Sequence, residues 1–114
     1  MGIRIRTNQL IYIIDLEGSL DLYESNRLKE LVMKMIEKKV ERFILNLRDI
    51  EALDSSGIGA FIYISSTIKK MNLGLAMANV RGPVRDIIEK TKLMNYFPIY
   101  EKMDDAIQAL SDLA

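Results

Sequence analysis

The sequence contains no cysteine and no histidine, and these two absences exclude several kinds of chemistry. Without cysteine there can be no disulfide, no thiol nucleophile and no cysteine-ligated zinc. Without histidine there is no Ser-His-Asp triad, no imidazole acid–base group and no histidine metal site. We therefore expect no catalytic apparatus of the hydrolase type, no metal site and no cofactor.

Long apolar runs and an excess of either charge are also missing. No apolar stretch approaches the roughly 18 residues of a membrane span, and the N-terminus lacks the apolar region of a signal peptide. We therefore expect a soluble, cytoplasmic protein. Lysine plus arginine and aspartate plus glutamate both number 16, so net charge gives no indication of direct nucleic-acid binding. With 114 residues, 49% of them hydrophobic, the chain is predicted to form one domain, residues 1–114.

The apolar pattern predicts strands and helices that alternate. The N-terminal part is expected to form a hairpin, with Ile3–Arg6 and Gln9–Leu16 flanking a turn at Thr7-Asn8. In order, the later elements are a helix with a stripe from Leu28 that ends near Lys38-Lys39, a strand Arg42–Leu47, a helix Ser56–Met71, a strand Leu73–Val80, a helix from Pro83, a strand Phe97–Glu101 and a helix from Asp104. The order ββαβαβαβα predicts an α/β fold, a single-layer, mostly parallel sheet with an antiparallel N-terminal edge strand.

The helix predicted over Ser56–Met71 carries apolar residues on more than one side. Its core face is expected to hold Ile58, Phe61, Ile62, Ser65 and Ile68. The positions beyond this stripe belong either to packing or bare surface, or to an interface with another protein; they are Ala60, Tyr63, Ile64 and Thr67.

The stretch LDSSGIGA, Leu53 to Ala60, is the most unusual in the chain. A nucleophile elbow reads G-x-S-x-G, and here the upstream glycine is missing for either serine. A dinucleotide-binding loop reads G-x-G-x-x-G, whereas Ile62 replaces the third glycine and Arg48–Leu53 is expected to be a loop between the strand and the glycines. No Gly-Lys-Ser/Thr follows, so a P-loop is excluded as well.

A helix N-terminus fits the same stretch. Either Ser55 or Asp54 can cap the helix by accepting a hydrogen bond from its first amides. Gly57 and Gly59 each disfavour helix by about 0.5–1 kcal/mol relative to alanine. Two of them in one turn call for a reason beyond capping. We interpret the missing Cβ atoms as opening this turn to the backbone or a side chain of a partner.

These residues also carry a resemblance to a known family. LDSSGIGAF, after FILNLRDIEAL, resembles the signature of the STAS domain, specifically of the bacterial anti-sigma factor antagonists. The upstream EGSLDLYESNRLKE is similar to the family's loop into its first helix, with Asp21 at the acidic position. The segment from Met77 to Leu110 is similar to the family's closing strand–helix–strand–helix unit.

The resemblance implies a binding protein that is itself a kinase substrate, and not an enzyme. It places a phosphorylation site at Ser55, the serine directly after the motif aspartate. The implied partner is an anti-sigma factor with serine kinase activity, bound by the unmodified form and released by the phosphorylated form, with a phosphatase that reverses the modification. The implied partner-binding residues are Asp21, Asp54, Ser56, Gly57, Ile58 and Gly59.

Other interpretations of the same residues stay open. Asp21, with Glu24 three residues on, predicts a capping box for the first helix, and its role is either that cap alone or the cap together with a place beside Ser55. Within the family, the chain could instead be a STAS subunit of a transporter or a signalling scaffold. A different class, a nucleotide-binding module or phosphotransfer enzyme, would use the turn at Gly57–Gly59.

Overall fold

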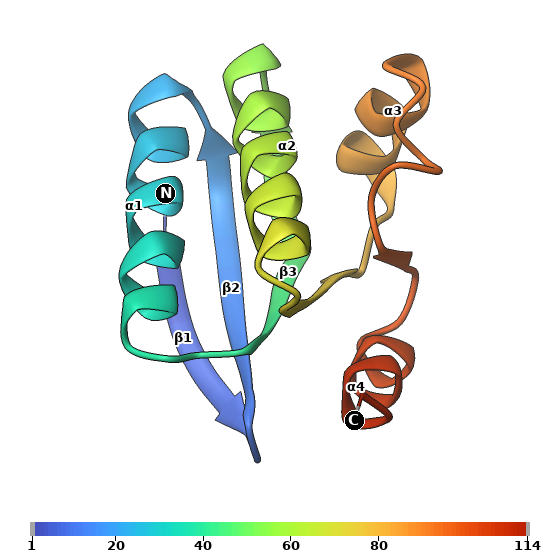
Figure 1. Ribbon diagram of the computed structural model, residues 1–114. Helices are drawn as coiled ribbons and strands as arrows, with labels where there is room; N and C mark the ends of the chain where they lie inside the picture. The colour runs from blue at the N-terminus through green and yellow to red at the C-terminus, as the bar shows by residue number, and fades with distance from the viewer. Residues whose placement is uncertain (1, 114) are drawn as a thin grey trace.

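The structure is a computed structural model in which residues 2–113 are described, and these form one five-stranded sheet and four helices (Figure 1). The elements in chain order are β1 (Gly2–Asn8), β2 (Ile11–Leu20), α1 (Leu22–Glu37), β3 (Arg42–Leu53), α2 (Ser55–Lys70), β4 (Gly74–Ala78), α3 (Gly82–Lys90), β5 (Ile99–Tyr100) and α4 (Met103–Ser111). The strands lie in the order β1-β2-β3-β4-β5, and only β1 runs antiparallel to its neighbour. The predicted fold class is confirmed.

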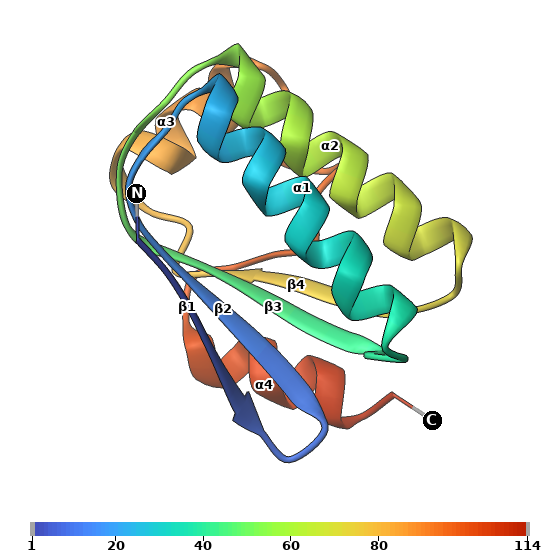
Figure 2. The ribbon, with the colours of Figure 1, turned by 90° about the vertical axis from the view of Figure 1, so that its left-hand side faces the viewer.

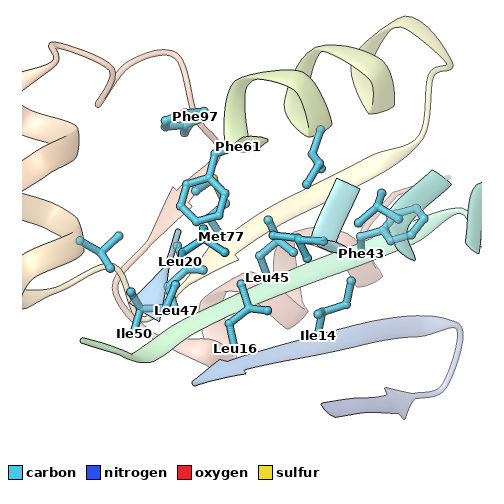
Figure 3. Packing of buried hydrophobic residues seen from close by; sticks show 14 of the residues in the cluster. Ile14, Leu16, Leu20, Phe43, Leu45, Leu47, Ile50, Phe61, Met77 and Phe97 are labelled. Carbon is cyan, nitrogen blue, oxygen red and sulfur yellow. The ribbon is translucent and has the colours of Figure 1, made fainter. Parts of the chain in front are cut away.

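Helices cover both faces of the sheet. Helices α1 and α2 lie side by side across one face, and α4 lies across the other (Figure 2). The larger apolar core fills the space under α1, α2 and α3, where Phe61 and Phe97 meet edge to face with ring centroids 6.3 Å apart (Figure 3). A smaller core lies under α4, around Ile13 and Ile44. Within residues 2–113, none of the helices is long and apolar enough to cross a membrane.

The hairpin turn lies two residues later than the sequence predicted. Thr7 and Asn8 still pair with β2, as Thr7↔Tyr12 and Asn8↔Ile11. The turn is therefore Gln9-Leu10, with Gln9 at φ 56°. Glutamine gives little signal for a left-handed conformation, in which glycine, asparagine and aspartate are the usual residues, so the pattern favoured the Thr7-Asn8 pair instead.

Strand β3 is twice the expected length, and the predicted loop at Arg48–Leu53 is wrong. The second half of β3 pairs with β2 through two irregularities, because the register moves from Asp15↔Asn46 to Glu17↔Asp49 and then from Gly18↔Ile50 to Ser19↔Ala52. At each step β3 contains one residue more than β2, which is a β-bulge. Two bulges remove the two-residue alternation by which strands are recognised.

This longer strand removes one argument against a dinucleotide-binding loop. Because β3 ends at Leu53 and α2 begins at Ser55, the glycines follow the strand almost directly. The other argument stands, since Ile62 occupies the position of the third glycine.

The buried face of α2 is rotated relative to the prediction. Ile62, expected in the core, is 36% exposed, whereas Ala60 and Ile64, expected beyond the core stripe, are 1% and 0% exposed. Helix α2 packs against the sheet and also against α1 alongside it (Figure 2). Its buried stripe is therefore centred on Phe61, Ile64 and Ile68, and Ile62 lies at the edge of that stripe.

The predicted elements after α2 are present with different ends. β4 and α3 match their expected places, and Pro83 lies in the first turn of α3 as predicted. β5 is only two residues long, because Phe97, expected at its start, turns into the core and is 5% exposed.

Candidate functional site

Two aspartates mark the edge of the sheet where β2 and β3 end. Leu20 and Leu53 are paired across these parallel strands, and each is followed directly by an aspartate and a helix. Asp21 is the N-cap of α1, and Asp54 is the N-cap of α2. The carboxyl ends of neighbouring parallel strands meet at one edge of a sheet, which is where open α/β folds place their functional residues.

Asp54, and not Ser55, caps α2. One carboxylate oxygen of Asp54, Oδ1, accepts hydrogen bonds from the backbone N–H of Ser56 at 2.8 Å and of Gly57 at 3.3 Å. Ser55 is the first residue of the helix and is exposed, while Ser56 is half-buried. Of the two capping residues that the sequence left open, the structure therefore selects the aspartate, and the Ser55 side chain is not used to begin the helix.

The two glycines of the motif have different surroundings. Gly57 is buried, and a Cβ atom there would lie 3.0 Å from Leu20 Cδ2, 3.1 Å from Leu53 Cβ and 3.2 Å from the Leu20 carbonyl oxygen. Close packing of α2 on the ends of β2 and β3 explains this glycine, contrary to the expectation of a turn open to a partner. Ile58, which is 7% exposed, also belongs to the core. Gly59 is exposed, and its Cβ would meet nothing within 4 Å.

Asp21 confirms the predicted cap of the first helix. Its carboxylate Oδ1 accepts a hydrogen bond from the Glu24 backbone N–H at 2.9 Å, and the side chain is exposed. Since Leu20 pairs with Leu53, Asp21 and Asp54 follow the ends of neighbouring strands. The structure thus gives Asp21 both the capping role and a place close to the start of α2.

Large apolar side chains are exposed beside this edge. Leu22 and Tyr23, in the first turn of α1, are 62% and 70% exposed, and Tyr63 of α2 is 48% exposed. Ser55, Gly59 and Tyr63 follow one another at intervals of four residues, which places them on one side of α2. Because α1 and α2 are neighbours (Figures 1 and 2), we call Leu22, Tyr23, Ser55, Gly59 and Tyr63 together the α1–α2 face.

The sequence-based argument left Tyr63 open and overlooked Leu22 and Tyr23. Two cations lie over the exposed rings: Lys29 Nζ is 5.5 Å from the Tyr63 centroid, and the Arg27 guanidinium carbon is 6.0 Å from that of Tyr23. The sequence does contain a signal for Leu22 and Tyr23, because they are two consecutive large apolar residues directly after a capping aspartate, Asp21. At the first turn of a helix, such residues extend past the end of the strand and are not covered by the sheet.

The edge combines exposed polar side chains with exposed apolar ones. Within residues 2–113, no group of three or more His, Cys, Asp or Glu side chains is placed to hold a metal ion. What the edge offers is an exposed hydroxyl at a helix N-terminus, two exposed carboxylates and a neighbouring apolar surface.

Comparison with known sequences identifies the family. The sequence profile of the STAS domain matches residues 2–106. The anti-sigma F factor antagonist of Paenibacillus polymyxa is 26% identical over 99% of this chain and 95% of its own length. The anti-sigma-B factor antagonist of Bacillus subtilis is 22% identical over 95% of this chain and 98% of its own length.

Solved structures share the fold at low identity. An anti-sigma factor antagonist from Thermotoga maritima, described as putative, superimposes with a TM-score of 0.88 at 19% identity, covering 96% of this chain and 94% of that one. The anti-sigma factor antagonist SpoIIAA in its unphosphorylated form gives 0.75 at 16% identity, covering 98% and 100%. A sulfate transporter family protein from Wolinella succinogenes gives 0.79 at 17% identity, covering 93% and 88%.

Proposed function

The chain belongs to the STAS domain family, and from this premise we propose that it is an anti-sigma factor antagonist switched by phosphorylation of Ser55. In the unmodified form it binds a cognate anti-sigma factor that has serine kinase activity, and the sigma factor is freed for transcription. Phosphorylated on Ser55, it releases that partner, and a phosphatase restores the binding form. Relatives named as anti-sigma factor antagonists align with nearly the whole chain, which supports the proposal.

The position of Ser55 is the observation that carries the proposal. Its side chain is exposed at the first helical residue of α2, and Asp54 already supplies the cap. A kinase can therefore reach the hydroxyl, and its modification removes no hydrogen bond that begins the helix. Ser56 is half-buried one residue further on, which makes it the less accessible of the two serines.

The charge of a phosphate explains release without unfolding. Phosphorylation adds about −1.5 to −2 charges at neutral pH, here next to Asp54 and close to Asp21. A helix N-terminus tolerates an anion because its free amides and dipole favour negative charge, so the fold survives. A partner that covers this edge must then bury a dianion beside two carboxylates, which is strongly unfavourable without a matching cation.

The α1–α2 face supplies the binding surface next to this switch. Leu22, Tyr23 and Tyr63 are exposed, and aromatic anchors with an apolar surround are typical of protein–protein interfaces. Gly59 lies between Ser55 and Tyr63 on α2 and lets a partner approach the helix backbone closely. Of the expected partner-binding residues, Asp21, Asp54, Ser56 and Gly59 can touch a partner, while Gly57 and Ile58 shape the surface from beneath.

A second candidate function is a STAS subunit of a transporter. The observation in favour of this candidate is that a sulfate transporter family protein from Wolinella succinogenes shares the fold. In that case the α1–α2 face would bind a transporter or scaffold, and Ser55 would not be the substrate of an anti-sigma factor kinase.

Phosphorylation by an anti-sigma factor kinase from the same genome separates the two candidates. After incubation with ATP, mass spectrometry should find one phosphate, on Ser55. The Ser55→Ala variant should take up none, and the Ser56→Ala variant should be modified like the unaltered protein. Phosphate on Ser56 alone would refute the assigned site, and no phosphate with any such kinase would favour the transporter role.

A further inference from the structure

A groove with a volume of about 650 Å³ lies at the opposite end of α2 from Ser55, beside β4. Residues from the second half of α2, from β4 and from the segment before β5 line it, among them Ser65, Ile68, Lys69, Leu73, Leu75 and Phe97. Pockets for small ligands have this size and combine an apolar lining with a few polar groups that orient the ligand.

The free edge of β4 opens into this groove. β5 is so short that it pairs only with Met77 and Ala78. The Gly74 N–H donates to the Glu41 carbonyl on the β3 side at 2.8 Å, and the Met77 N–H donates to the Pro98 carbonyl on the β5 side at 2.8 Å. Successive backbone groups of a strand point to opposite sides, so the Leu75 N–H and C=O point the same way as those of Met77, where β5 does not reach. Leu75 thus offers backbone hydrogen-bonding groups to a ligand.

Ile68 and Phe97 form an apolar part of the groove wall, and both are held in place by packing. The Phe97 ring contacts Phe61 at 6.3 Å and Tyr96 at 5.3 Å between centroids, both edge to face. Ile68 is 2% exposed. The Ser65 hydroxyl is buried, and it makes no hydrogen bond within residues 2–113. Ser65 is also among the residues that line the groove, and its hydroxyl has no existing bond within that range to lose on binding a ligand.

The charged and polar side chains that line the groove indicate which kind of ligand it can bind. Among the residues of the described range 2–113 that line it, Lys69 is the only one with a charged side chain, and none is acidic. Its donors include the Lys69 ammonium, the Leu75 N–H and the Ser65 hydroxyl, and the side chains of Asn72, Asn95 and Tyr96 can both donate and accept. A carboxylate accepts such bonds, and bonds that involve an ionised group are the stronger kind.

We propose that this groove is a binding site for a small amphipathic monocarboxylate. Its carboxylate interacts with Lys69, and its hydrocarbon part lies against Leu73, Leu75 and Phe97. Ser55 and Ser65 are ten residues apart on α2, roughly 15 Å at the rise of an α-helix. The site is therefore separate from the proposed phosphorylation switch, and either can fail without the other.

An NMR titration of the intact chain with sodium octanoate tests the site, with the backbone amide chemical shifts as the readout. We expect saturable shifts at 65–75 and 95–98 and none at 54–59. Octanol has the same chain without the charge and should bind about tenfold more weakly, and octylammonium more weakly still. Lys69→Gln should weaken octanoate binding by about tenfold and leave octanol unaffected. Lys70→Gln, which removes a neighbouring charge that does not line the groove, is the matched control and should bind like the unaltered protein.

Three results would overturn the proposal. Octanoate could cause no saturable shift, or shifts spread over the whole surface. The two lysine variants could lose affinity equally, which would show attraction by net charge alone. Octanol could bind as tightly as octanoate, which would show an apolar surface without a carboxylate site.

Discussion

Asp54 and Ser55 are neighbours with separate tasks at the start of α2. Asp54 Oδ1 holds two backbone amides of the first turn, whereas the Ser55 side chain is exposed. Such a division lets one residue keep the helix intact while the next changes its charge. It also makes the consequences of substituting the two residues distinguishable.

Substitution of the cap should affect stability, and substitution of the serine should not. Asp54→Ala should lower the free energy of unfolding by about 0.5–2 kcal/mol because two amides lose their acceptor. Asp54→Asn keeps an acceptor and should lose less. Ser55→Ala should stay within about 0.5 kcal/mol of the unaltered protein, as surface substitutions usually do. Denaturant unfolding measures all three, and a larger loss for Ser55→Ala than for Asp54→Ala would show that the serine is the cap.

Replacement by alanine should change the stability of the fold in opposite directions at the two glycines of the motif. Gly59→Ala places a Cβ where nothing lies within 4 Å, so it should stabilise the helix by about 0.5–1 kcal/mol. Gly57→Ala places a Cβ 3.0 Å from Leu20 and 3.1 Å from Leu53. Overpacking costs about 1–3 kcal/mol, which exceeds the gain in helix propensity.

Thermal unfolding of the two alanine variants therefore gives Gly59→Ala the higher midpoint and Gly57→Ala the lower one. Although Gly59→Ala should be the more stable variant, it should bind the partner more weakly in a binding assay, because its added methyl group fills space on the α1–α2 face. A Gly57→Ala protein as stable as Gly59→Ala would contradict the packing argument.

At the scale of elements, a polar network ties β1, β2, β3 and the end of β4 together on the α4 side of the sheet. Asp15 on β2 accepts from Arg6 Nε at 2.7 Å and from Asn46 Nδ2 at 2.7 Å, and Asn79 Nδ2 donates to Asn46 Oδ1 at 2.8 Å. Partial burial by itself would raise the pKa of the Asp15 carboxyl, but the hydrogen bonds from Arg6 and Asn46 outweigh it and lower the pKa below the ordinary value.

The direction of this shift predicts how stability depends on pH. Because the carboxyl has a lower pKa in the folded chain, its stabilising effect is fully present above the ordinary aspartate pKa of about 3.9 and is lost as pH falls through the folded value. Asp15→Asn should therefore be less stable than the unaltered protein at neutral pH, and the difference should shrink below about pH 3. Urea unfolding at both pH values measures it, and a difference that does not change with pH would contradict the account.

How much of each element could be predicted depends on whether its pattern is regular. The alternation of strand and helix, and with it the mostly parallel sheet, follows from runs whose apolar period is intact. β3 fails this test after Asn46, because its bulges bury Ile50 and Leu53 at an interval of three residues. The phase of α2 was missed for another reason, since contact with α1 widens its buried face to include Ala60 and Ile64. Both errors come from tertiary pairing that a single sequence does not contain.

At the scale of the whole molecule, the motif around Asp54 and Ser55 could be predicted and the surface around it could not. The local sequence carries the helix start, its two candidate caps and the glycines. The packing of Gly57 against Leu20 depends on a strand 37 positions earlier in the chain, and the exposure of Leu22 and Tyr23 depends on where α1 leaves the sheet. The α1–α2 face and the groove beside β4 exist only once distant segments are brought together.

The affinity of Ser55→Asp for the anti-sigma factor tests the central claim most directly. Ser55→Ala should bind like the unaltered protein, and Ser55→Asp should bind roughly tenfold or more weakly, since one added charge corresponds to at least 1.4 kcal/mol at a covered surface. Ser111→Asp adds the same charge at an exposed position of α4, on the opposite face of the sheet from α2 (Figure 2), and should bind normally. All three should keep the thermal midpoint of the unaltered protein. A folded Ser55→Asp protein that binds as tightly as the unaltered one would contradict the switch.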